Sequence, residues 1–336
     1  MVRPELQLHP YTEPVIARPA ATVLLLRDVA DGFEVLMTQR SPTASFAPNM
    51  YVFPGGAVDS GETFEQAAVR ECMEELSVQI DIATLRYQSH WVTDRDMSKR
   101  FDVRFYVAPM PAGQTPVADE QEQFRPTWVK PTDALAMQKS PDTAKQFPII
   151  FPTLRTLEWL AKFSSSGAVF AACEAFNGKP QWSTCPRSAM LAGKPHYYME
   201  HDAPYGELAM VCPDGIKRHA LDWTHDAPVP LLKHVRRLTC GNPSMMTGPG
   251  TNTYIVGTNE TGFIVFDPGP YHSYDVSVPS ADIDHVQRIF DACGGETNCD
   301  IRAIVCTHSH PDHSPAAKPL QALCKKAGKP VPRFMA

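Results

Sequence analysis

Three glutamates in the N-terminal third of the chain have the spacing of a metal-binding carboxylate cluster. Glu71, Glu74 and Glu75 stand at positions i, i+3 and i+4, so a helix places them on one face. Like charges on one face repel one another, and a divalent cation removes that conflict. Carboxylate oxygens suit Mg²⁺, which also engages substrate phosphates. The spacing therefore indicates a magnesium site, and a solvated acidic helix face is the plainer alternative for three glutamates alone.

The residues that precede this helix provide a turn and a possible ion pair. Gly55 and Gly56 let the backbone turn tightly and approach a ligand closely. Arg70 is placed to pair with a carboxylate, and Glu62 is the candidate partner. The turn, the ion pair and the three glutamates all fall within residues 55–78.

Residues 56–78 as a whole resemble the Nudix box, G-x5-E-x7-R-E-U-x-E-E-x-G-U, where U is a bulky apolar residue. Every charged position of the box has its match, from Glu62 through Arg70 to Glu75. Ser77 stands where the box has its last glycine. Glycine at a helix C-terminus serves a left-handed cap, so we expect this serine to cost about 1 kcal/mol of stability rather than activity.

The resemblance to Nudix hydrolases implies hydrolysis of a nucleoside diphosphate linked to another moiety. It implies Mg²⁺ or Mn²⁺ ions held by Glu71, Glu74 and Glu75, which neutralise the diphosphate while a water attacks one phosphorus. One of these glutamates could also serve as a base. Arg70 and Glu62 would fix the helix. The catalytic residues implied are therefore Arg70, Glu71, Glu74 and Glu75, with Glu62 in a structural role.

Residues 35–56 narrow the choice of substrate class. They resemble the signature of coenzyme A pyrophosphatases within the Nudix family, L-L-T-x-R-S-x3-R-x3-G-x3-F-P-G-G. The matching positions are Thr38, Arg40, Ser41 and Phe53 to Gly56. Ser45 replaces the signature's second arginine and Asn49 its internal glycine. Guanidinium reads phosphate with two donors, so the 3′-phosphate of CoA lacks a partner unless Arg95 or Arg100 substitutes. CoA, acyl-CoA and other nucleoside diphosphate derivatives all stay open.

Four residues are expected to contact the substrate: Arg40, Gly55, Gly56 and Glu122. A further carboxylate from a later loop often joins Nudix sites, and Glu120 and Glu122 are the candidates because they lie shortly before Trp128. Solvated loop acids are an equal alternative for these two. Arg40 has the alternative of a surface charge at the end of a strand.

A second group of potential metal ligands lies near the other end of the chain. His308, His310, Asp312 and His313 follow an apolar run, and this set of side chains is a metal-ligand constellation. The pattern resembles the H-x-H-x-D-H motif of the metallo-β-lactamase fold. Residues 247–257 and 265–270 also resemble the opening strands of that fold. The resemblance implies a first Zn²⁺ on the first two histidines and a second on Asp312 and His313.

This C-terminal unit is expected to be incomplete. The family needs a further histidine, a bridging acid and a final histidine from downstream, whereas the chain ends 23 residues after His313. We therefore expect an incomplete zinc site, an exposed sheet face and edge, and the least stable part of the chain. Four nearby cysteines have no common zinc-site spacing and are interpreted as buried core thiols: Cys293, Cys299, Cys306 and Cys324.

Three functions follow from these motifs. The leading hypothesis is an Mg²⁺- or Mn²⁺-dependent Nudix diphosphatase with an appended, truncated metallo-β-lactamase-like region. The second is a zinc-dependent hydrolase of thioesters or RNA in a full-length parent, with the Nudix part selecting the substrate. The third is a Nudix fold kept as a non-catalytic ligand-binding module, against which the intact set of three glutamates argues.

The elements that would position these residues indicate an α/β (α+β) chain in three regions. We expect a Nudix α/β/α sandwich over residues 12–163, a β-rich connector over 164–232, and the first half of a metallo-β-lactamase αββα sandwich over 233–336. Alternation predicts a hairpin over 20–40 and a strand over 100–109. Helical periodicity predicts helices over residues 63–76, 131–137, 151–163, 282–293 and 316–327.

Composition limits the class of protein and its partners. The chain has 336 residues and a net charge of −6, which argues against general nucleic-acid binding. No stretch reaches the length of apolar sequence that spans a membrane, and the first residues lack a secretory signal. Nine scattered cysteines without a Cys-x-x-Cys pair favour reduced thiols in a cytoplasmic protein. The expected partner is a small-molecule nucleoside diphosphate derivative, and a homodimer is open.

Overall fold

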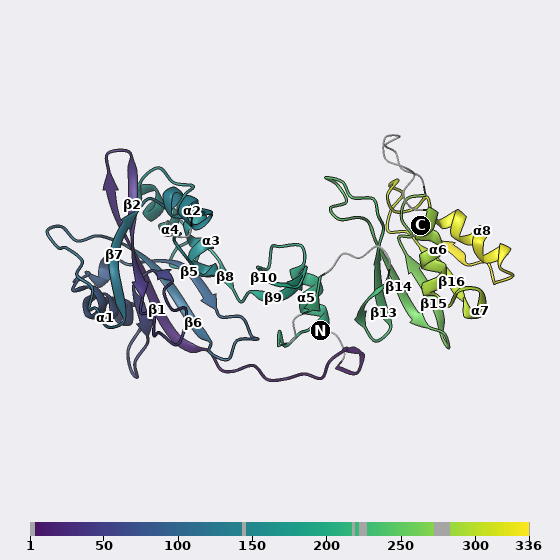
Figure 1. Cartoon of the computed structure of the whole chain (residues 1–336), viewed down its shortest axis with the longest axis horizontal. Coiled ribbons are helices and arrows are strands. Elements are labelled where there is room, and N and C mark those ends of the chain that lie inside the picture. The colour runs from purple at the N-terminus through teal and green to yellow at the C-terminus, as the bar shows by residue number, and fades with distance from the viewer. Residues whose placement is uncertain (1–3, 143–145, 217–218, 222–226, 272–282, 336) are drawn as a thin grey trace. The chain divides into compact units, whose positions relative to one another are not determined.

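The computed structural model of the chain describes residues 4–142, 146–216, 219–221, 227–271 and 283–335 (Figure 1). It divides into two compact units, each described here by itself. The first unit comprises Pro14–Arg187 and Tyr197–Asp202, and the second unit comprises Met1–Glu13, Ser188–His196 and Ala203–Ala336.

A mixed sheet is the framework of the first unit. Its strands are β1 (Arg18–Val29), β2 (Gly32–Arg40), β3 (Tyr51–Val52), β4 (Gly55–Ala57), β5 (Arg86–Val92), β6 (Phe101–Pro109), β7 (Gln123–Val129) and β8 (Ser183–Thr184). They follow the order β3-β2-β1-β6-β5-β8, while β4 pairs with β1 and β7 pairs with β2. β1 and β2 form the antiparallel hairpin predicted over 20–40, and β1 runs parallel to β6.

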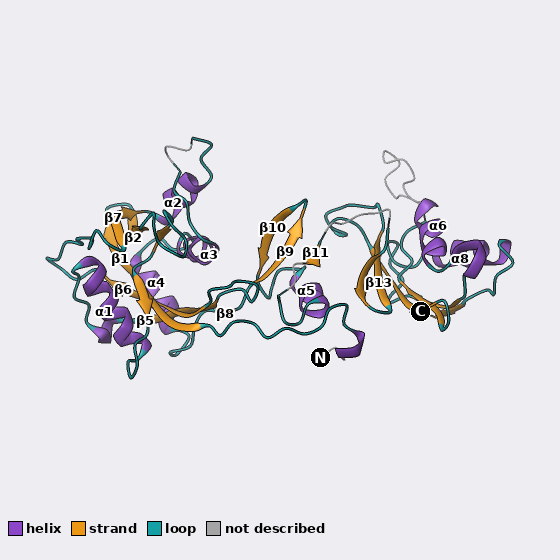
Figure 2. Cartoon of the chain, turned by 60° about the horizontal axis from the view of Figure 1, so that its bottom comes forward, coloured by secondary structure: helices purple, strands orange, loops and turns teal. Residues whose placement is uncertain are grey.

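Helices cover both faces of this sheet (Figure 2). They are α1 (Phe64–Leu76), α2 (Pro131–Gln138), α3 (Phe151–Leu160) and α4 (Ser166–Glu174), with the short 3-10 turn η2 (Ile82–Thr84) after α1. Val23 and Leu25 of β1 pack in one core with residues of α1. Leu24 and Leu26 point to the opposite face and pack with residues of α3 and α4. This double burial explains why β1 is a continuous apolar run.

Both ends of α1 are defined by local contacts. Thr63 caps the N-terminus by accepting a hydrogen bond from the Gln66 amide, and the Gln66 side chain accepts one from the Thr63 amide in return. Ser77 caps the C-terminus with φ 56° and ψ 30°, and its N–H donates to carbonyls of the last turn. The helix predicted over 63–76 is confirmed, and serine does occupy a left-handed cap there.

A second sheet organises the second unit. Its strands run in the order β12 (Val229–Leu232), β13 (Val235–Thr239), β14 (Asn252–Thr258), β15 (Gly262–Phe266), β16 (Ile301–Val305) and β17 (Arg333–Met335). Helices α6 (Ile283–Ala292) and α8 (Ala317–Lys326) pack on it in one core, and the short α7 (Gly295–Asn298) follows α6. The core includes Cys293, Cys299, Cys306 and Cys324, which are buried free thiols as predicted. Ile264 and Met335 on this sheet are 37% and 50% exposed.

Residues 164–232, expected to be β-rich, also hold two helices that the sequence did not predict. The short strands there include β8, β9 (Arg187–Leu191), β10 (Lys194–Tyr198) and β11 (His219–Ala220); the helices are α4 and α5 (Tyr205–Val211). Ser165 is the N-cap of α4, so the serine-rich start of this region is a helix cap rather than a linker. Asp282, the predicted start of α6, lies outside the described residues. No helix in the described part of the chain is long and apolar enough to cross a bilayer.

Candidate active site

Glu75 is the most constrained of the three predicted ligand glutamates. It is 4% exposed, and its Oε2 accepts a hydrogen bond of 2.9 Å from the Gly55 amide. Its Oε1 accepts one of 2.8 Å from the Gln123 side-chain amide. The Gln123 carbonyl oxygen in turn accepts a hydrogen bond of 2.8 Å from the Thr38 hydroxyl. The carboxylate is therefore held by the turn before α1 and by strands β2 and β7.

Burial raises the pKa of Glu75 to about 8, because the charged form loses hydration. The hydrogen bonds from Gln123 and Gly55 oppose that rise, and so does the positive charge of Arg40. Glu71 adds a like charge that raises the pKa of Glu75 further. A buried carboxyl group with a pKa near neutrality is poised to exchange a proton or to accept a cation.

Glu71 fits against the backbone of Gly56. A Cβ atom at Gly56 would lie 2.3 Å from Glu71 Oε1, so any other residue there would displace the carboxylate. At Gly55 the φ of 152° and a Cβ position 2.2 Å from the Ala21 carbonyl oxygen also demand glycine. Burial raises the pKa of Glu71 as well. Both predicted glycines are thus explained by close approach.

Arg70 is the hub that holds the acidic residues together. Its Nε and Nη2 each donate a 3.0 Å hydrogen bond to one oxygen of Glu62, the pairing the sequence predicted. Its Nη1 donates to Glu71 at 3.0 Å and to Glu74 at 2.8 Å. Nη2 also donates to the Ala57 carbonyl oxygen at 2.8 Å. The Arg70 hydrogen bonds lower the pKa of the Glu62 carboxyl group, so Glu62 stays ionised.

The loop before β7 carries the two later carboxylates. Asp119 organises it, because Asp119 Oδ1 accepts hydrogen bonds from the amides of Gln121, Glu122 and Gln123. The Asp119 amide donates to the Glu75 carbonyl oxygen, which joins this loop to α1. Glu120 and Glu122 are exposed. The charge of Glu122 contributes to raising the pKa of Glu71, which places it near the cluster, so Glu122 remains the better candidate of the two.

The predicted phosphate-reading arginines differ in what they bind. Arg40 Nε donates to the Phe46 carbonyl oxygen at 3.0 Å, and the Arg40 charge acts on Glu75. Arg100 is 8% exposed and donates to the carbonyl oxygens of Val15 and Thr93. Its guanidinium is therefore committed to the backbone, and Arg100 is not placed to replace the missing second arginine of the CoA signature.

The histidine motif of the second unit lies in the loop after β16. The rings of His308 and His313 are 4.1 Å apart and those of His308 and His310 are 4.5 Å apart, between centroids. Asp312 Oδ2 lies 3.3 Å from His313 Nε2. His308 and His310 are exposed, while Asp312 and His313 are half-buried. The four predicted zinc ligands are thus neighbours in space.

Asp267 anchors this loop although the sequence did not single it out. Its Oδ1 accepts a 2.8 Å hydrogen bond from the Thr307 amide, and its Oδ2 accepts one of 2.8 Å from the Thr307 hydroxyl. Asp267 Oδ2 also lies 3.1 Å from His313 Nδ1. The residue is buried and has a left-handed φ of 48°. The signal that could have found it was the Asp-Pro-Gly turn that follows β15.

Two stretches of the chain match models of known families. Residues 17–150 match the family model for the NUDIX domain, over the carboxylate helix and its sheet. We refer to residues 17–150 as the Nudix domain after this match. Residues 246–332 match the family model for the Metallo-beta-lactamase superfamily, over the histidine loop and its sheet.

Three curated proteins are similar to the Nudix domain. A Nudix hydrolase of Deinococcus radiodurans is 32% identical over 113 residues, which are 33% of this chain and 64% of that protein. The uncharacterized Nudix hydrolase NudL of Klebsiella aerogenes is 37% identical over 75 residues, 22% of this chain and 61% of that protein. The putative nudix hydrolase 7 of Caenorhabditis elegans is 46% identical over 66 residues, 18% of this chain and 22% of that protein. The chain therefore spans less than two thirds of each relative.

Solved structures of Nudix proteins also resemble this chain. The crystal structure of a NUDIX hydrolase from Alicyclobacillus acidocaldarius is 22% identical and covers 46% of this chain and 96% of that one, with a TM-score of 0.42. The NUDIX domain of Shewanella oneidensis NrtR, complexed with ADP ribose, is 19% identical and covers 44% of this chain and 87% of that one, with a TM-score of 0.35.

The acidic residues of the Nudix domain fit a divalent cation by their chemistry. Within the described residues, no three His, Cys, Asp or Glu side chains are already gathered as a metal-binding group. The geometry explains this, because Arg70 Nη1 bonds both Glu71 and Glu74 while Glu75 faces Gly55 and Gln123. The donors are all carboxylate oxygens, which suit Mg²⁺ or Mn²⁺. Gly56 leaves room for the Glu71 carboxylate beside the turn.

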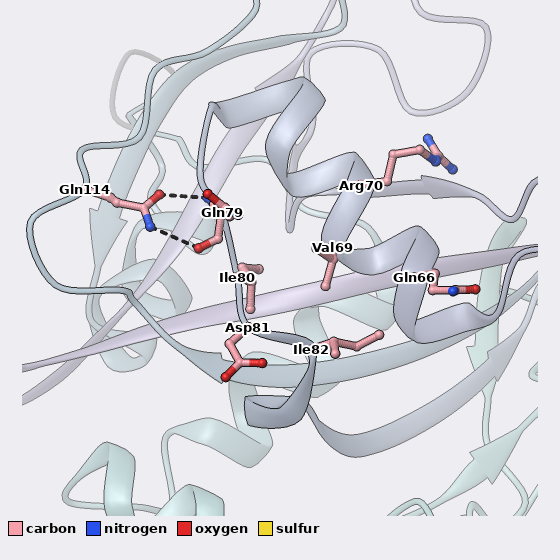
Figure 3. A pocket seen from close by; sticks show the side chains of 8 residues that line it. All are labelled: Gln66, Val69, Arg70, Gln79, Ile80, Asp81, Ile82 and Gln114. Atoms are coloured by element: carbon pink, nitrogen blue, oxygen red, sulfur yellow. Dashed lines mark hydrogen bonds between the residues drawn. The ribbon is translucent and has the colours of Figure 1, made fainter.

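A surface groove of about 700 Å³ lies along the other side of α1 in the Nudix domain (Figure 3). Val69, Ile80 and Ile82 line it, and Gln79 and Gln114 close one end with two hydrogen bonds. Glu71, Glu74 and Glu75 do not line this groove. In Figure 3 the Arg70 guanidinium points away from the apolar residues. Arg70, which holds Glu71 and Glu74, also lines the groove, so the groove borders the carboxylate cluster.

Sequence reasoning missed the residues that hold the three predicted ligand glutamates. Gln123 is fully buried at the start of β7, and it joins Thr38 to Glu75. Asp119 shapes the loop that carries Glu120 and Glu122. Neither Gln123 nor Asp119 lies in the Nudix box. They reach Glu75 only because β7 and the loop before it pack close to α1.

Proposed function

We propose that the Nudix domain hydrolyses the diphosphate linkage of a nucleoside diphosphate derivative with Mg²⁺ or Mn²⁺ held by Glu71, Glu74 and Glu75. The observation that carries this proposal is the state of Glu75, buried beside two other acids and held by Gly55 and Gln123. A helix with a purely structural role has no use for three acids, one of them buried at high cost. Ionised carboxylates that are buried beside one another are stabilised strongly by a bound cation, because the cation offsets both their repulsion and their loss of hydration.

Each residue of the cluster has a separate task. Bound divalent ions would neutralise the diphosphate and make a water more acidic. Before a metal ion binds, Arg70 ties Glu62, Glu71 and Glu74 into one unit. Glu75, held in place by Gly55 and Gln123, is the group assigned to take a proton from the attacking water. Gly55 and Gly56 let the phosphates approach the backbone of the turn.

CoA or acyl-CoA is the substrate that the upstream residues favour. Thr38, Arg40 and Ser41 match the CoA signature, and Arg40 lies close enough to Glu75 to influence its pKa. Arg40 would then meet the diphosphate and Glu122 the nucleoside side of the ligand. ADP-ribose is the alternative to compare first, because an NrtR Nudix domain is found in complex with it.

A turnover assay with a panel of diphosphates tests this function. CoA, acetyl-CoA, NADH, ADP-ribose and a dinucleoside polyphosphate are offered to the full chain with Mg²⁺ or with EDTA. We expect Mg²⁺-dependent release of 3′-phospho-AMP from CoA, reduced about 10²–10⁴-fold by Glu75→Gln. Glu65→Gln is the matched control, because Glu65 lies on the same helix and instead accepts a hydrogen bond from Tyr106.

The other outcomes of the assay separate the remaining hypotheses. Cleavage of another panel member keeps the hydrolase and discards CoA. Binding of a nucleotide without turnover of any, with Mg²⁺ and with Mn²⁺, would favour the non-catalytic module. Equal rates in wild type and Glu75→Gln would contradict the assigned role of the carboxylate cluster.

The histidine loop supports a second candidate, a zinc site in the second unit. The ring centres of His310 and His313 lie 4.5 Å and 4.1 Å from that of His308, and neutral imidazole is a preferred zinc ligand. Co²⁺ in place of Zn²⁺ gives a visible absorption that reports the ligand set. We expect that absorption with the full chain and its loss in His310→Ala, and an unchanged spectrum in this variant would contradict the site.

A further inference from the structure

A second hydrogen-bonded chain of reactive residue types lies in the first unit, away from the Nudix glutamates. The Ser183 hydroxyl on β8 is 2.7 Å from His90 Nδ1 on β5. His90 Nε2 is 2.6 Å from Asp102 Oδ1 on β6. The three strands are neighbours in the sheet, with Ser183 directly opposite His90. A hydroxyl, an imidazole and a carboxylate in this order match a nucleophile, its base and the group that orients the base.

Strand register places these side chains on the α1 face of the sheet. His90 pairs directly with Arg104, and Asp102 precedes Arg104 by two residues, so the three share a face. The Arg104 guanidinium carbon lies 3.9 Å from the ring centre of Phe64, the first residue of α1. Trp91, next to His90, points the other way into the core with Phe105.

A cavity of about 480 Å³ opens on the same face. Tyr87, Tyr106 and Arg104 contribute to its wall, whereas Glu71, Glu74, Glu75, Ser183, His90 and Asp102 do not. Arg104 connects the cavity to the three reactive residues, because it is the strand partner of His90. Tyr87 pairs with Tyr106 across β5 and β6, and their ring centres are 5.5 Å apart. Aromatic rings beside a guanidinium form a surface on which a flat aromatic group can stack.

The three reactive side chains are accessible to solvent. Ser183 is exposed, and the His90 and Asp102 side chains are 26% and 41% exposed. Asp102 accepts a hydrogen bond only if His90 carries its proton on Nε2, which leaves the Nδ1 lone pair facing the Ser183 hydroxyl. That tautomer is the one able to remove the hydroxyl proton.

We propose that Ser183, His90 and Asp102 form a second, metal-independent hydrolytic site for small esters with an aromatic acyl group. Ser183 Oγ bonds to the ester carbonyl carbon while His90 Nδ1 takes the hydroxyl proton. The bond from that carbon to the alcohol oxygen then breaks, and the alcohol leaves with the proton from His90. Water attacks the acyl-Ser183 ester by the same route, releasing the acid and restoring the serine. The acyl ring packs against Tyr87 and Arg104.

The alternative is that these contacts only fasten the two-residue strand β8 to the edge of the sheet. Fastening requires the hydrogen bonds but gives Ser183 no greater reactivity than any exposed serine. Reactivity requires His90 as a base, and it does not depend on metal ions or on Glu75. The two roles are therefore separated by measuring the chemistry of the hydroxyl rather than stability.

The experiment treats the full chain with a fluorophosphonate probe in EDTA and maps the labelled residue by mass spectrometry. We expect a covalent label on Ser183, absent in Ser183→Ala and formed at least about tenfold more slowly in His90→Gln. Ser98→Ala is the matched control, since Ser98 is an exposed serine of the same unit. Hydrolysis of p-nitrophenyl benzoate in EDTA should follow the same order.

Several results would overturn the proposal. One is labelling of Ser183 no faster than that of Ser98. The other is equal ester hydrolysis by wild type and His90→Gln when both show the same thermal unfolding. A variant with a lowered melting temperature and a wild type without label would mean that the three residues only fasten β8.

Discussion

The two sets of potential metal ligands in this chain differ in what holds their side chains. The glutamates of the Nudix domain stand on a helix whose ends are capped, and Glu75 is enclosed by Gly55 and Gln123. The histidines of the second unit stand in a loop, and His308 and His310 are exposed. The loop depends on Asp267, which holds Thr307 and lies beside His313.

This difference follows from the charge of the ligands. Clustered carboxylates repel one another, so the Nudix domain supplies Arg70 as an internal cation. Neutral imidazoles do not repel, and they need orientation rather than neutralisation, which an acid behind the loop provides. The first site therefore stores electrostatic strain and the second does not. The following predictions test that contrast.

The largest expected effect is a pH dependence of stability in the metal-free Nudix domain. The pKa of Glu75 rises from an ordinary 4.5 in the unfolded chain to about 8 in the folded protein. Between these pH values the folded protein binds a proton that the unfolded chain does not, so the stability of the fold decreases as the pH rises. The free energy of unfolding should fall by up to about 1.4 kcal/mol for each pH unit between these values. Thermal unfolding in EDTA measures it, and Glu75→Gln should flatten the curve.

The opposite slope would be evidence against a buried, strained carboxylate. Glu62 acts in the other direction, because its lowered pKa makes its contribution present above pH 4.5 and lost at lower pH. The effect of Glu62 on stability falls below pH 4.5, whereas that of Glu75 falls between pH 4.5 and about 8, so one pH titration of stability separates the two contributions.

Gly56→Ala should reduce turnover of the Nudix substrate by about 10–100-fold without unfolding the protein. The new Cβ would lie 2.3 Å from Glu71 Oε1, so the carboxylate must move. Steady-state kinetics with Mg²⁺ measures the loss. Gly167→Ala is the matched control, because its Cβ would meet its nearest neighbour at 4.0 Å. Unchanged kinetics in Gly56→Ala would show that the position of Glu71 is not critical.

Gln123 contacts Glu75 in the first unit, and Asp267 lies beside His313 in the second. Changing either residue should weaken metal binding in its own unit by about tenfold. Gln123→Met removes the amide that holds Glu75, and Asp267→Asn removes the charge behind His313. Mn²⁺ titration followed by electron paramagnetic resonance reports the first, and competition with a zinc-chelating dye reports the second. The assigned roles would be contradicted if either variant left metal binding in its own unit unchanged, or weakened metal binding in the other unit.

The smallest expected effect concerns the end of the Nudix helix. Ser77→Gly should raise the free energy of unfolding by about 0.5–1 kcal/mol, because serine at φ 56° carries strain that glycine does not. Chemical denaturation measures this change, and turnover should stay the same. A loss of activity would mean that the serine is retained for function rather than tolerated.

The sequence predicted the elements whose residues are local to one another. Helix α1, the hairpin of β1 and β2, and the pairing of Arg70 with Glu62 all depend on short spacings, which periodicity and motif reveal. Gln123 and Asp267 could not be predicted in this way, because their roles arise when distant strands meet. Helix α4 was missed because its serine-rich start has the composition of a linker.

The hydrogen bonds of Arg70 would make entry of a metal ion at the proposed site an exchange of one cation for another. Its guanidinium already contacts Glu62, Glu71 and Glu74, so an arriving ion competes with a resident positive charge. A sodium or potassium ion brings a single charge, no more than the guanidinium it would displace, and lacks its directed donors. A doubly charged ion gains more from the carboxylates than the guanidinium gives up. At the proposed metal site, Arg70 would therefore favour doubly charged over singly charged ions before any substrate arrives.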